Sequence, residues 1–563
     1  MTLRQALFWG GLALLAGLAA PAAAHDSAAH GTKAATVYPT LKSRGVVGKA
    51  MVDNVSMTTA ARNTIYSCQW SRGTAGYGFS WVNTTTQALS FAGKPIVEGS
   101  VEWTSYYKSM ASGSTLQVGS NGLPNHLTGT FPVSSSTEAG QPQYHPNPGS
   151  ISAKRLYADL PLNPTYSATP NCIGGIVGFL FTGALLFNAL DADGRDAVAN
   201  EMTDQCEGHP NDTSYHYHHL TNCYTDSTSG HSVQVGWALD GFGIYGPKGE
   251  SGATLTNADL DECHGHTHGV TQADGTTKTV YHYHGNEEFP YVVGCFRGTR
   301  SASERSLVQT TTPANGFWYT STASGRGFGI EVQGSSMFFG IYTYDATGAD
   351  IWYVGNCMLG AATCSGQLQG YAGGTTFANL GGTASAPAAT ASPASYTLTV
   401  TSASAITVTI TPASGSPTTY ALTRFPIDGA TVAGAPSWAP VSGWWWAPAY
   451  SGTGWFIESQ GSVVQNGTTY SRFFAVGYAY GSTGAAGQAN WYGGSGLYTN
   501  TTASASMWQG TLNEFTGGPT LTGASGTIRA TDRGPATIRF SSTTTGTVIL
   551  PNGQAIAIQR FQF

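Results

Sequence analysis

The sequence has few charged residues and no cluster of basic ones. Only 10% of its 563 residues are charged, the formal net charge is -6, and no run of Lys and Arg occurs. Proteins that bind nucleic acid or anionic membrane surfaces need a concentrated positive surface. Neither is therefore an expected partner.

Beyond its first 24 residues, the chain has no apolar run long enough to cross a bilayer. Residues 1–24 contain one cation, Arg4, an apolar run over residues 7–20 and three alanines at 22–24. This arrangement is typical of a secretory signal peptide, and the short apolar run argues against a retained membrane helix. We expect a secreted protein, periplasmic or extracellular, without a transmembrane segment.

The sequence also lacks the common motifs of acyl and nucleotide chemistry. It has no Gly-x-Ser-x-Gly nucleophile elbow, phosphate-binding loop or dinucleotide fingerprint. Glycine is abundant instead, with 74 residues, and Ser, Thr and turn signals recur at short intervals. This composition favours β-sheet over helical bundles, so we predict a mainly β protein with three or four domains.

Histidine is concentrated between residues 206 and 295, which hold ten of the 14 histidines. The tetrapeptide Tyr-His-Tyr-His occurs twice there, at residues 215–218 and 281–284. Each copy follows an apolar segment (177–183 or 235–241) and a Cys-x-Gly-His segment (206–209 or 263–266), and each precedes a cysteine. We infer an internal duplication with approximate two-fold symmetry.

The alternation of side chains along a strand places the two histidines of each tetrapeptide on one face. A pair of neutral imidazoles can hold one zinc or copper ion, and we expect the two strands to bring four to six imidazoles to one point. The predicted metal ligands are His216, His218, His282, His284, His209 and His266, with His126 as an outside candidate.

The alternative is that these histidines have a purely structural role. Imidazoles can donate and accept hydrogen bonds in a glycine-rich core, and Tyr-His alternation also suits a half-buried strand. The glycines around His264, His266 and His268 predict a solvated loop at that place.

The sequence assigns no reaction. Asp240 and Asp261 are weak candidates for proton transfer, because catalytic metal sites usually have a nearby carboxylate. The equivalent of Asp240 in the first repeat is Thr182, so the symmetry breaks there. That break is compatible with a one-sided active site, but we favour a role for Asp240 in capping the turn at Gly241.

The segment from about residue 90 to 300 resembles the YHYH-domain family, which is named for the tetrapeptide. The resemblance rests on the motifs above and on residues 121–126, 208–210, 238–247, 260–263 and 289–291. It implies a type of domain and no reaction.

Eight cysteines in an oxidising compartment should mostly be paired. The repeat suggests pairs 206–223 and 263–295, residues 357 and 364 would close a short loop, and residues 68 and 172 remain. Pairs swapped between the two repeats are an alternative.

The C-terminal half contains a second, unrelated repeat. Residues 316–331, 342–353 and 366–374 match residues 443–458, 478–492 and 510–518, and alternating apolar residues predict antiparallel β modules at 313–428 and 440–563. These patterns resemble tandem modules of exported bacterial proteins. Their aromatic clusters, such as residues 444–446, suit stacking on sugar rings or on a protein surface, but recurrence in both copies favours core packing. Residues 25–89 form a linker or a lead-in with strands.

Our leading hypothesis is a secreted protein whose YHYH-like domain, residues 90–300, binds a transition metal. The competing hypothesis is a non-catalytic surface or adhesion protein with structural histidines and ligand-binding β modules. A third is an enzyme on an extracellular polymer, anchored to that polymer or to an envelope surface by the C-terminal modules.

Overall fold

The computed structural model describes residues 47–49, 54–69, 71, 81–83, 85–86, 88–90, 94, 96–112, 114–133, 149–211, 214–224, 228–271, 277–300, 312–359, 363–481, 487–499, 507–523 and 526–563. The predicted signal peptide, residues 1–24, lies outside them. The described chain is mainly β, as predicted, and no helix in it combines the length and apolar character needed to cross a membrane. It forms two compact units, the N-terminal unit (Ala19–Val308) and the C-terminal unit (Gln309–Phe563). The finer domain boundaries stay predictions.

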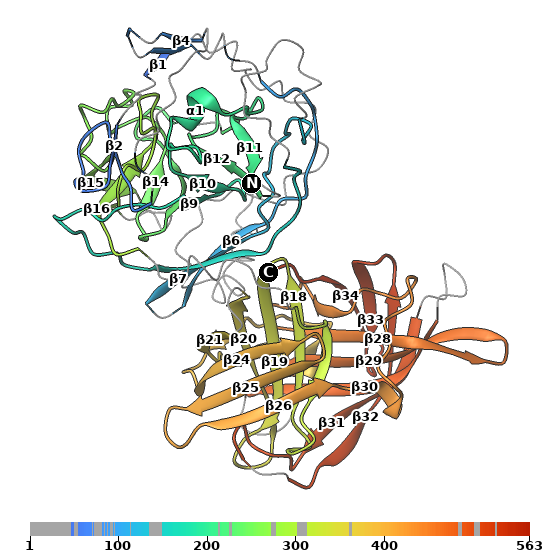
Figure 1. Ribbon diagram of the computed structural model, residues 1–563. Helices are drawn as coiled ribbons and strands as arrows, with labels where there is room; N and C mark the ends of the chain where they lie inside the picture. Colours follow the sequence, from blue (N-terminus) through green and yellow to red (C-terminus); the bar gives the residue numbers. More distant parts are fainter. Residues whose placement is uncertain are drawn as a thin grey trace. The chain divides into compact units, whose positions relative to one another are not determined.

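An eight-stranded sheet forms the centre of the N-terminal unit (Figure 1). Its strands, in spatial order, are β11 (Gly208–Asn211), β12 (Ser214–Tyr217), β10 (Leu185–Phe187), β9 (Ile176–Leu180), β13 (Gln234–Ala238), β14 (Gly243–Tyr245), β16 (Thr277–His284) and β15 (Gly265–Thr271).

The strand order of this sheet confirms the internal duplication. The two repeats meet where β9 pairs antiparallel with β13, with Phe179 opposite its repeat equivalent Trp237. From this pair outward, each half has four strands paired in the same way, and each half ends in an antiparallel hairpin: β11–β12 on one side and β15–β16 on the other. The pseudo-two-fold axis therefore passes through the β9–β13 pair, perpendicular to the sheet.

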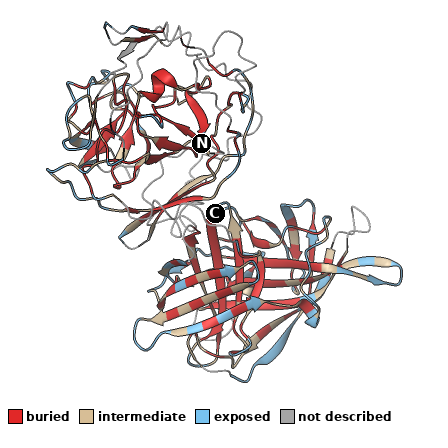
Figure 2. Ribbon diagram, viewed as in Figure 1, coloured by how far each residue is buried: buried red, intermediate tan, exposed pale blue. Residues whose placement is uncertain are grey.

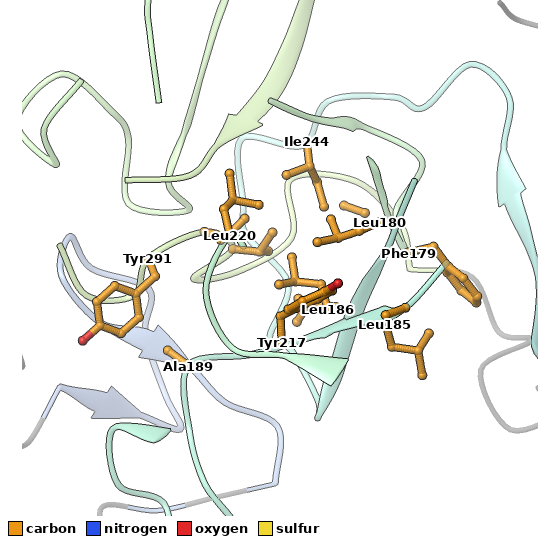
Figure 3. Close-up of a cluster of buried hydrophobic side chains, with 14 of the residues drawn as sticks. Phe179, Leu180, Leu185, Leu186, Ala189, Tyr217, Leu220, Ile244 and Tyr291 are labelled. Atoms are coloured by element: carbon orange, nitrogen blue, oxygen red, sulfur yellow. The ribbon is translucent and has the colours of Figure 1, made fainter. Parts of the chain in front are cut away.

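The apolar core of this unit packs on the central sheet. Figure 3 shows Phe179, Leu180, Leu185 and Leu186 gathered with Tyr217, and all of these side chains are buried. The tyrosines of both Tyr-His-Tyr-His segments belong to this core cluster. Since side chains alternate along a strand, the histidines between them face the other side of the sheet.

Smaller elements and disulfides complete the N-terminal unit. One small sheet consists of β1 (Val47–Lys49), β5 (Ala88–Ser90) and β4 (Val82–Asn83), and a second consists of β2 (Val55–Ser56) and β3 (Ile65–Tyr66). A third consists of β6 (Tyr107–Ser112), β7 (Thr115–Ser120) and β8 (Leu156–Pro161). The unit also contains the short helix α1 (Ala197–Asn200). All four predicted cysteine pairs of the chain are confirmed: 68–172, 206–223, 263–295 and 357–364.

The C-terminal unit consists of two repeated antiparallel β modules. The first module is an eight-stranded sheet of β20 (Asp350–Met358), β19 (Ser336–Tyr344), β18 (Gly327–Gln333), β17 (Gly316–Tyr319), β26 (Thr418–Arg424), β25 (Ala405–Pro412), β24 (Ala394–Ser402) and β21 (Thr363–Gln367), and β22 (Tyr371–Ala372) pairs with β23 (Ala388–Ala389). The disulfide between Cys357 and Cys364 joins its two edge strands.

The second module is a closed barrel with the same cyclic strand order. It contains β27 (Gly443–Trp446), β28 (Gly454–Gln465), β29 (Thr468–Tyr480), β30 (Ala489–Thr499), β31 (Met507–Thr516), β32 (Arg529–Phe540), β33 (Thr545–Ile549) and β34 (Ala555–Arg560). Figure 2 shows buried residues along the middle of its strands and exposed residues towards the end of the β28–β29 hairpin, where Val464 is exposed.

Each module has a buried carboxylate that forms an ion pair with an arginine of the other module. Glu331 of the first module pairs with Arg560 and accepts a 2.6 Å hydrogen bond from the Trp444 backbone N–H. Glu458 of the second pairs with Arg424 and accepts the equivalent 2.6 Å bond from Phe317. Both carboxylates are 2% exposed or less, so the tandem repeat has the reciprocal contacts of a two-fold pair.

Candidate functional site

Three histidines at one end of the central sheet form the first histidine cluster. His209 of β11 lies directly opposite His216 of β12, and His218 follows β12. One ring nitrogen from each lies within 4.8 Å of those of the other two, and all three side chains are buried. The ring of Phe187 packs on His216 with centroids 4.1 Å apart, which covers the cluster from the neighbouring strand β10.

Five histidines at the opposite end form the second histidine cluster. Its members are His231, His266, His268, His282 and His284. His266 of β15 lies opposite His282 of β16, which repeats the His209–His216 pair of the first cluster. Two members are buried and three are partly exposed, so solvent reaches this cluster more easily than the first.

The expectation that all these imidazoles meet at one point is wrong. Strands β12 and β16 are separated by β10, β9, β13 and β14 (Figure 1). Five strand spacings amount to about 24 Å along a flat sheet. The pseudo-two-fold axis places the two Tyr-His-Tyr-His strands near opposite edges, so each gathers its own cluster.

The predicted loop around His264, His266 and His268 is also wrong at the last two positions. Residues Gly265–Thr271 form β15, paired along its length with β16. Glycine is needed at Gly265 because a Cβ there would lie 2.4 Å from the Tyr281 hydroxyl oxygen. In the first repeat, a Cβ on Gly208 would likewise clash with the ring of Tyr215. These glycines are therefore needed for close packing of a tyrosine ring and do not indicate a loop.

Backbone carbonyls fix the tautomer of most cluster histidines. In the first cluster, Nδ1 of His216 lies 3.2 Å from the Ser214 carbonyl oxygen and Nδ1 of His218 lies 2.5 Å from that of Asn188. A carbonyl can only accept, so Nδ1 carries the proton and Nε2 keeps its lone pair. The Nε2 atoms of His216 and His218 then face each other at 3.2 Å.

The second cluster repeats this arrangement with more members. Nδ1 of His231, His282 and His284 lies 2.7, 3.0 and 2.5 Å from a backbone carbonyl oxygen. Their Nε2 atoms converge: that of His231 is 3.2 Å from those of both His282 and His284, and His266 Nε2 is 3.1 Å from His284 Nε2.

Two lone pairs at such distances repel unless a cation lies between them. A proton is disfavoured here, because burial lowers the pKa of His218 to about 4 and that of His282 to about 2, and holds the pKa of His216 and His284 well below the usual value. A tetrahedral metal ion bound at 2.0–2.1 Å separates its nitrogen ligands by about 3.3 Å. The observed separations match that value, and backbone partners on Nδ1 are the usual outer contacts of metal-bound histidine.

The two carboxylates named as catalytic candidates bond to tyrosines on the core face of the sheet. Asp240 accepts bonds from the Tyr283 hydroxyl at 2.6 Å and the Gly298 backbone N–H at 2.9 Å, and burial raises its pKa to about 6. Asp261 accepts bonds from the Tyr281 hydroxyl at 3.0 Å and from the Arg297 guanidinium at 2.8 Å. Neither belongs to a histidine cluster in the described chain, and their catalytic role stays a prediction.

Two further histidines have structural surroundings. His126 lies with Nε2 2.6 Å from the Tyr217 hydroxyl and Nδ1 2.9 Å from the Leu127 carbonyl oxygen. It also approaches Cys206 and Cys223, but these form a disulfide and offer no thiolate ligand. His264 bonds to the His284 carbonyl and the Asn257 side chain.

Sequence reasoning missed His231, whose repeat equivalent is Ile173. A search restricted to duplicated histidines therefore passes over it. Sequence reasoning also missed the two ion pairs of His219. Its Nδ1 lies 3.1 Å from Oε2 of Glu207, and its Nε2 lies 3.3 Å from Oε2 of Glu287. Burial lowers the pKa of His219, but the two carboxylates outweigh burial and raise it to about 10.

The comparisons with known proteins identify one domain. Residues 157–257 match the model of a family described as YHYH protein. That range holds the first repeat and the beginning of the second. No curated protein and no solved structure shows significant similarity to the chain.

Proposed function

We propose that the N-terminal unit, of which residues 157–257 match the YHYH family model, is the metal-binding part of a secreted protein, with one transition-metal ion in each histidine cluster. The observation that carries the proposal is the convergence of Nε2 atoms at 3.1–3.2 Å, with the Nδ1 atoms of five of the rings held by backbone carbonyls.

The donor set favours zinc or copper. All ligands are neutral imidazoles, which suit both ions, and no thiolate or carboxylate belongs to either cluster within the described residues. The first cluster offers three imidazoles, the number that leaves a fourth position for water or substrate in zinc enzymes. The second offers four or five, the number of a filled coordination shell.

A secreted location is the second part of the proposal. Four disulfides and no free cysteine are typical of proteins that fold in an oxidising compartment. Binding to an extracellular polymer or an envelope surface through the C-terminal modules is a separate proposal, which is compatible with either role for the histidines.

Elemental analysis of tag-free protein secreted into metal-replete medium tests the metal proposal. We expect about two zinc or copper ions per chain. The double variant His216→Ala/His218→Ala should lose one of them, and His282→Ala/His284→Ala should lose the other. His126→Gln is the matched control, since His126 is a buried histidine outside both clusters, and it should keep both ions. A wild-type protein without bound metal would overturn the proposal in favour of structural histidines.

A further inference from the structure

The second histidine cluster has two imidazoles more than the first, although the two clusters are repeat equivalents. Three of its five members repeat the three histidines of the first cluster. The other two are His231 and His268, and their equivalents in the first repeat are Ile173 and Asn211. Because the strands pair in the same way in both halves of the sheet, the two clusters differ in side chains and not in backbone arrangement.

The ring of His268 has the protonation expected of a metal ligand. Its Nδ1 lies 3.0 Å from the Gly269 carbonyl oxygen and 3.2 Å from a carboxylate oxygen of Glu250. Both oxygens accept, so Nδ1 carries the proton and Nε2 keeps its lone pair. This Nε2 is buried and has no hydrogen-bond partner among the described residues, while the rings of His266 and His282 lie 4.5 Å away between centroids.

Glu250 gives His268 the outer contact that metal-bound histidines usually have. A carboxylate on the outer nitrogen fixes the orientation of a ligating ring and raises its basicity. The equivalent of Glu250 in the first repeat is Ala192. The additional carboxylate therefore accompanies the additional imidazole.

Five imidazoles around one ion favour copper(II) over zinc. Zinc in a closed protein site takes four ligands in a tetrahedron, so a fifth nitrogen adds little to its binding. Copper(II) takes a tetragonal arrangement that includes weaker axial ligands, and among divalent ions of its row it binds nitrogen most tightly. No cysteine belongs to the cluster, which disfavours copper(I).

The spacing of the ligand atoms allows all five to share one ion. One ring nitrogen from each histidine lies within 4.8 Å of those of the other four. Ligands on opposite sides of a single ion bound at 2.0–2.1 Å are about 4.2 Å apart, so small rotations of the rings bring all five nitrogens into contact with it.

We propose that the second histidine cluster is a copper(II) site of five imidazoles in which His268 is the fifth ligand. The first cluster, with three imidazoles, lacks this preference for copper. The inference rests on the proposed function, since it requires that the cluster holds an ion, and it adds the identity of that ion and of its last ligand.

Competition between copper and zinc at the second cluster tests the proposal. The full-length secreted protein with His216→Ala/His218→Ala serves as the parent, so that binding reports the second cluster alone. Metal-free parent titrated with copper(II) should give a tetragonal electron paramagnetic resonance spectrum that persists in a ~100-fold excess of zinc. In this parent, His268→Asn introduces the residue of the first repeat and should weaken copper(II) binding about 10- to 100-fold. Zinc affinity should change less than about 3-fold, because four imidazoles remain for a tetrahedral ion.

Thr267→Asn is the matched control, because Thr267 is the exposed neighbour of His268 on β15 and receives the same new side chain. It should bind both ions as the parent does, and the thermal midpoints of the metal-free proteins report intact packing. X-ray absorption at the copper edge gives the ligand number without any change at His268, and we expect five nitrogens in the parent.

Four or fewer nitrogens in the parent, or an unchanged copper(II) affinity in a folded His268→Asn variant, would overturn this inference and leave the cluster as a metal site of another kind. If neither ion binds to the parent or to the wild type, the proposed function falls together with it.

Discussion

Acid should destabilise the N-terminal unit through its buried histidines, and His126 gives the clearest case. Its side chain is 6% exposed, and burial lowers its pKa from 6.5 to about 4. Between these two values the unfolded chain binds a proton that the folded chain does not bind. The free energy of unfolding therefore falls as the pH decreases from about 7 towards 4, and the contribution of His126 is about 2 kcal/mol at pH 5 and about 3 kcal/mol at pH 4.

The assay is urea unfolding of metal-free protein, followed by near-ultraviolet circular dichroism at several pH values from 8 to 5. His126→Gln keeps a side chain that can hydrogen-bond and cannot titrate, so its loss of stability between pH 8 and pH 5 should be smaller than that of the wild type by about 2 kcal/mol. Any constant difference at pH 8 reports the altered hydrogen bonds to Tyr217 and Leu127. Parallel pH curves for the two proteins would show that His126 does not contribute to the acid sensitivity.

Two other substitutions test the module contact and the second histidine cluster. Glu458→Ala removes the ion-pair partner of the half-buried Arg424 guanidinium, and Glu331→Ala removes that of the buried Arg560. Each should lower the free energy of unfolding of the C-terminal unit by about 3 kcal/mol, measured by calorimetry. An effect below about 1 kcal/mol in both would contradict the reciprocal arrangement. Gly265→Ala pushes Tyr281 away and should weaken metal binding at the second cluster about 10- to 100-fold while the first keeps its ion. Gly269→Ala, whose Cβ would lie 3.1 Å from a flexible methyl group, is the control and should bind as the wild type does.

Local features of the N-terminal unit could be predicted from sequence because they depend on strand periodicity. The alternation of Tyr and His correctly predicted two imidazoles on one face of each strand. The tyrosines on the other face lie in the core. The repeated order of motifs correctly predicted the duplication and its two internal disulfides.

The number of clusters could not be predicted, because it depends on where the symmetry axis lies. A sequence repeat does not say whether two halves face each other or lie side by side in one sheet. Here Phe179 pairs with Trp237 at the axis, which keeps the two histidine strands apart. His231 could not be found from the repeat, since Ile173 occupies the equivalent position.

Anomalous X-ray diffraction at the zinc and copper absorption edges, on crystals of tag-free protein, shows whether each histidine cluster holds its own ion. We expect two separate peaks in the N-terminal unit, each about 2.0–2.1 Å from the Nε2 atoms that converge on it. The absence of an anomalous peak at both clusters, with ordered water between the rings, would contradict the metal proposal.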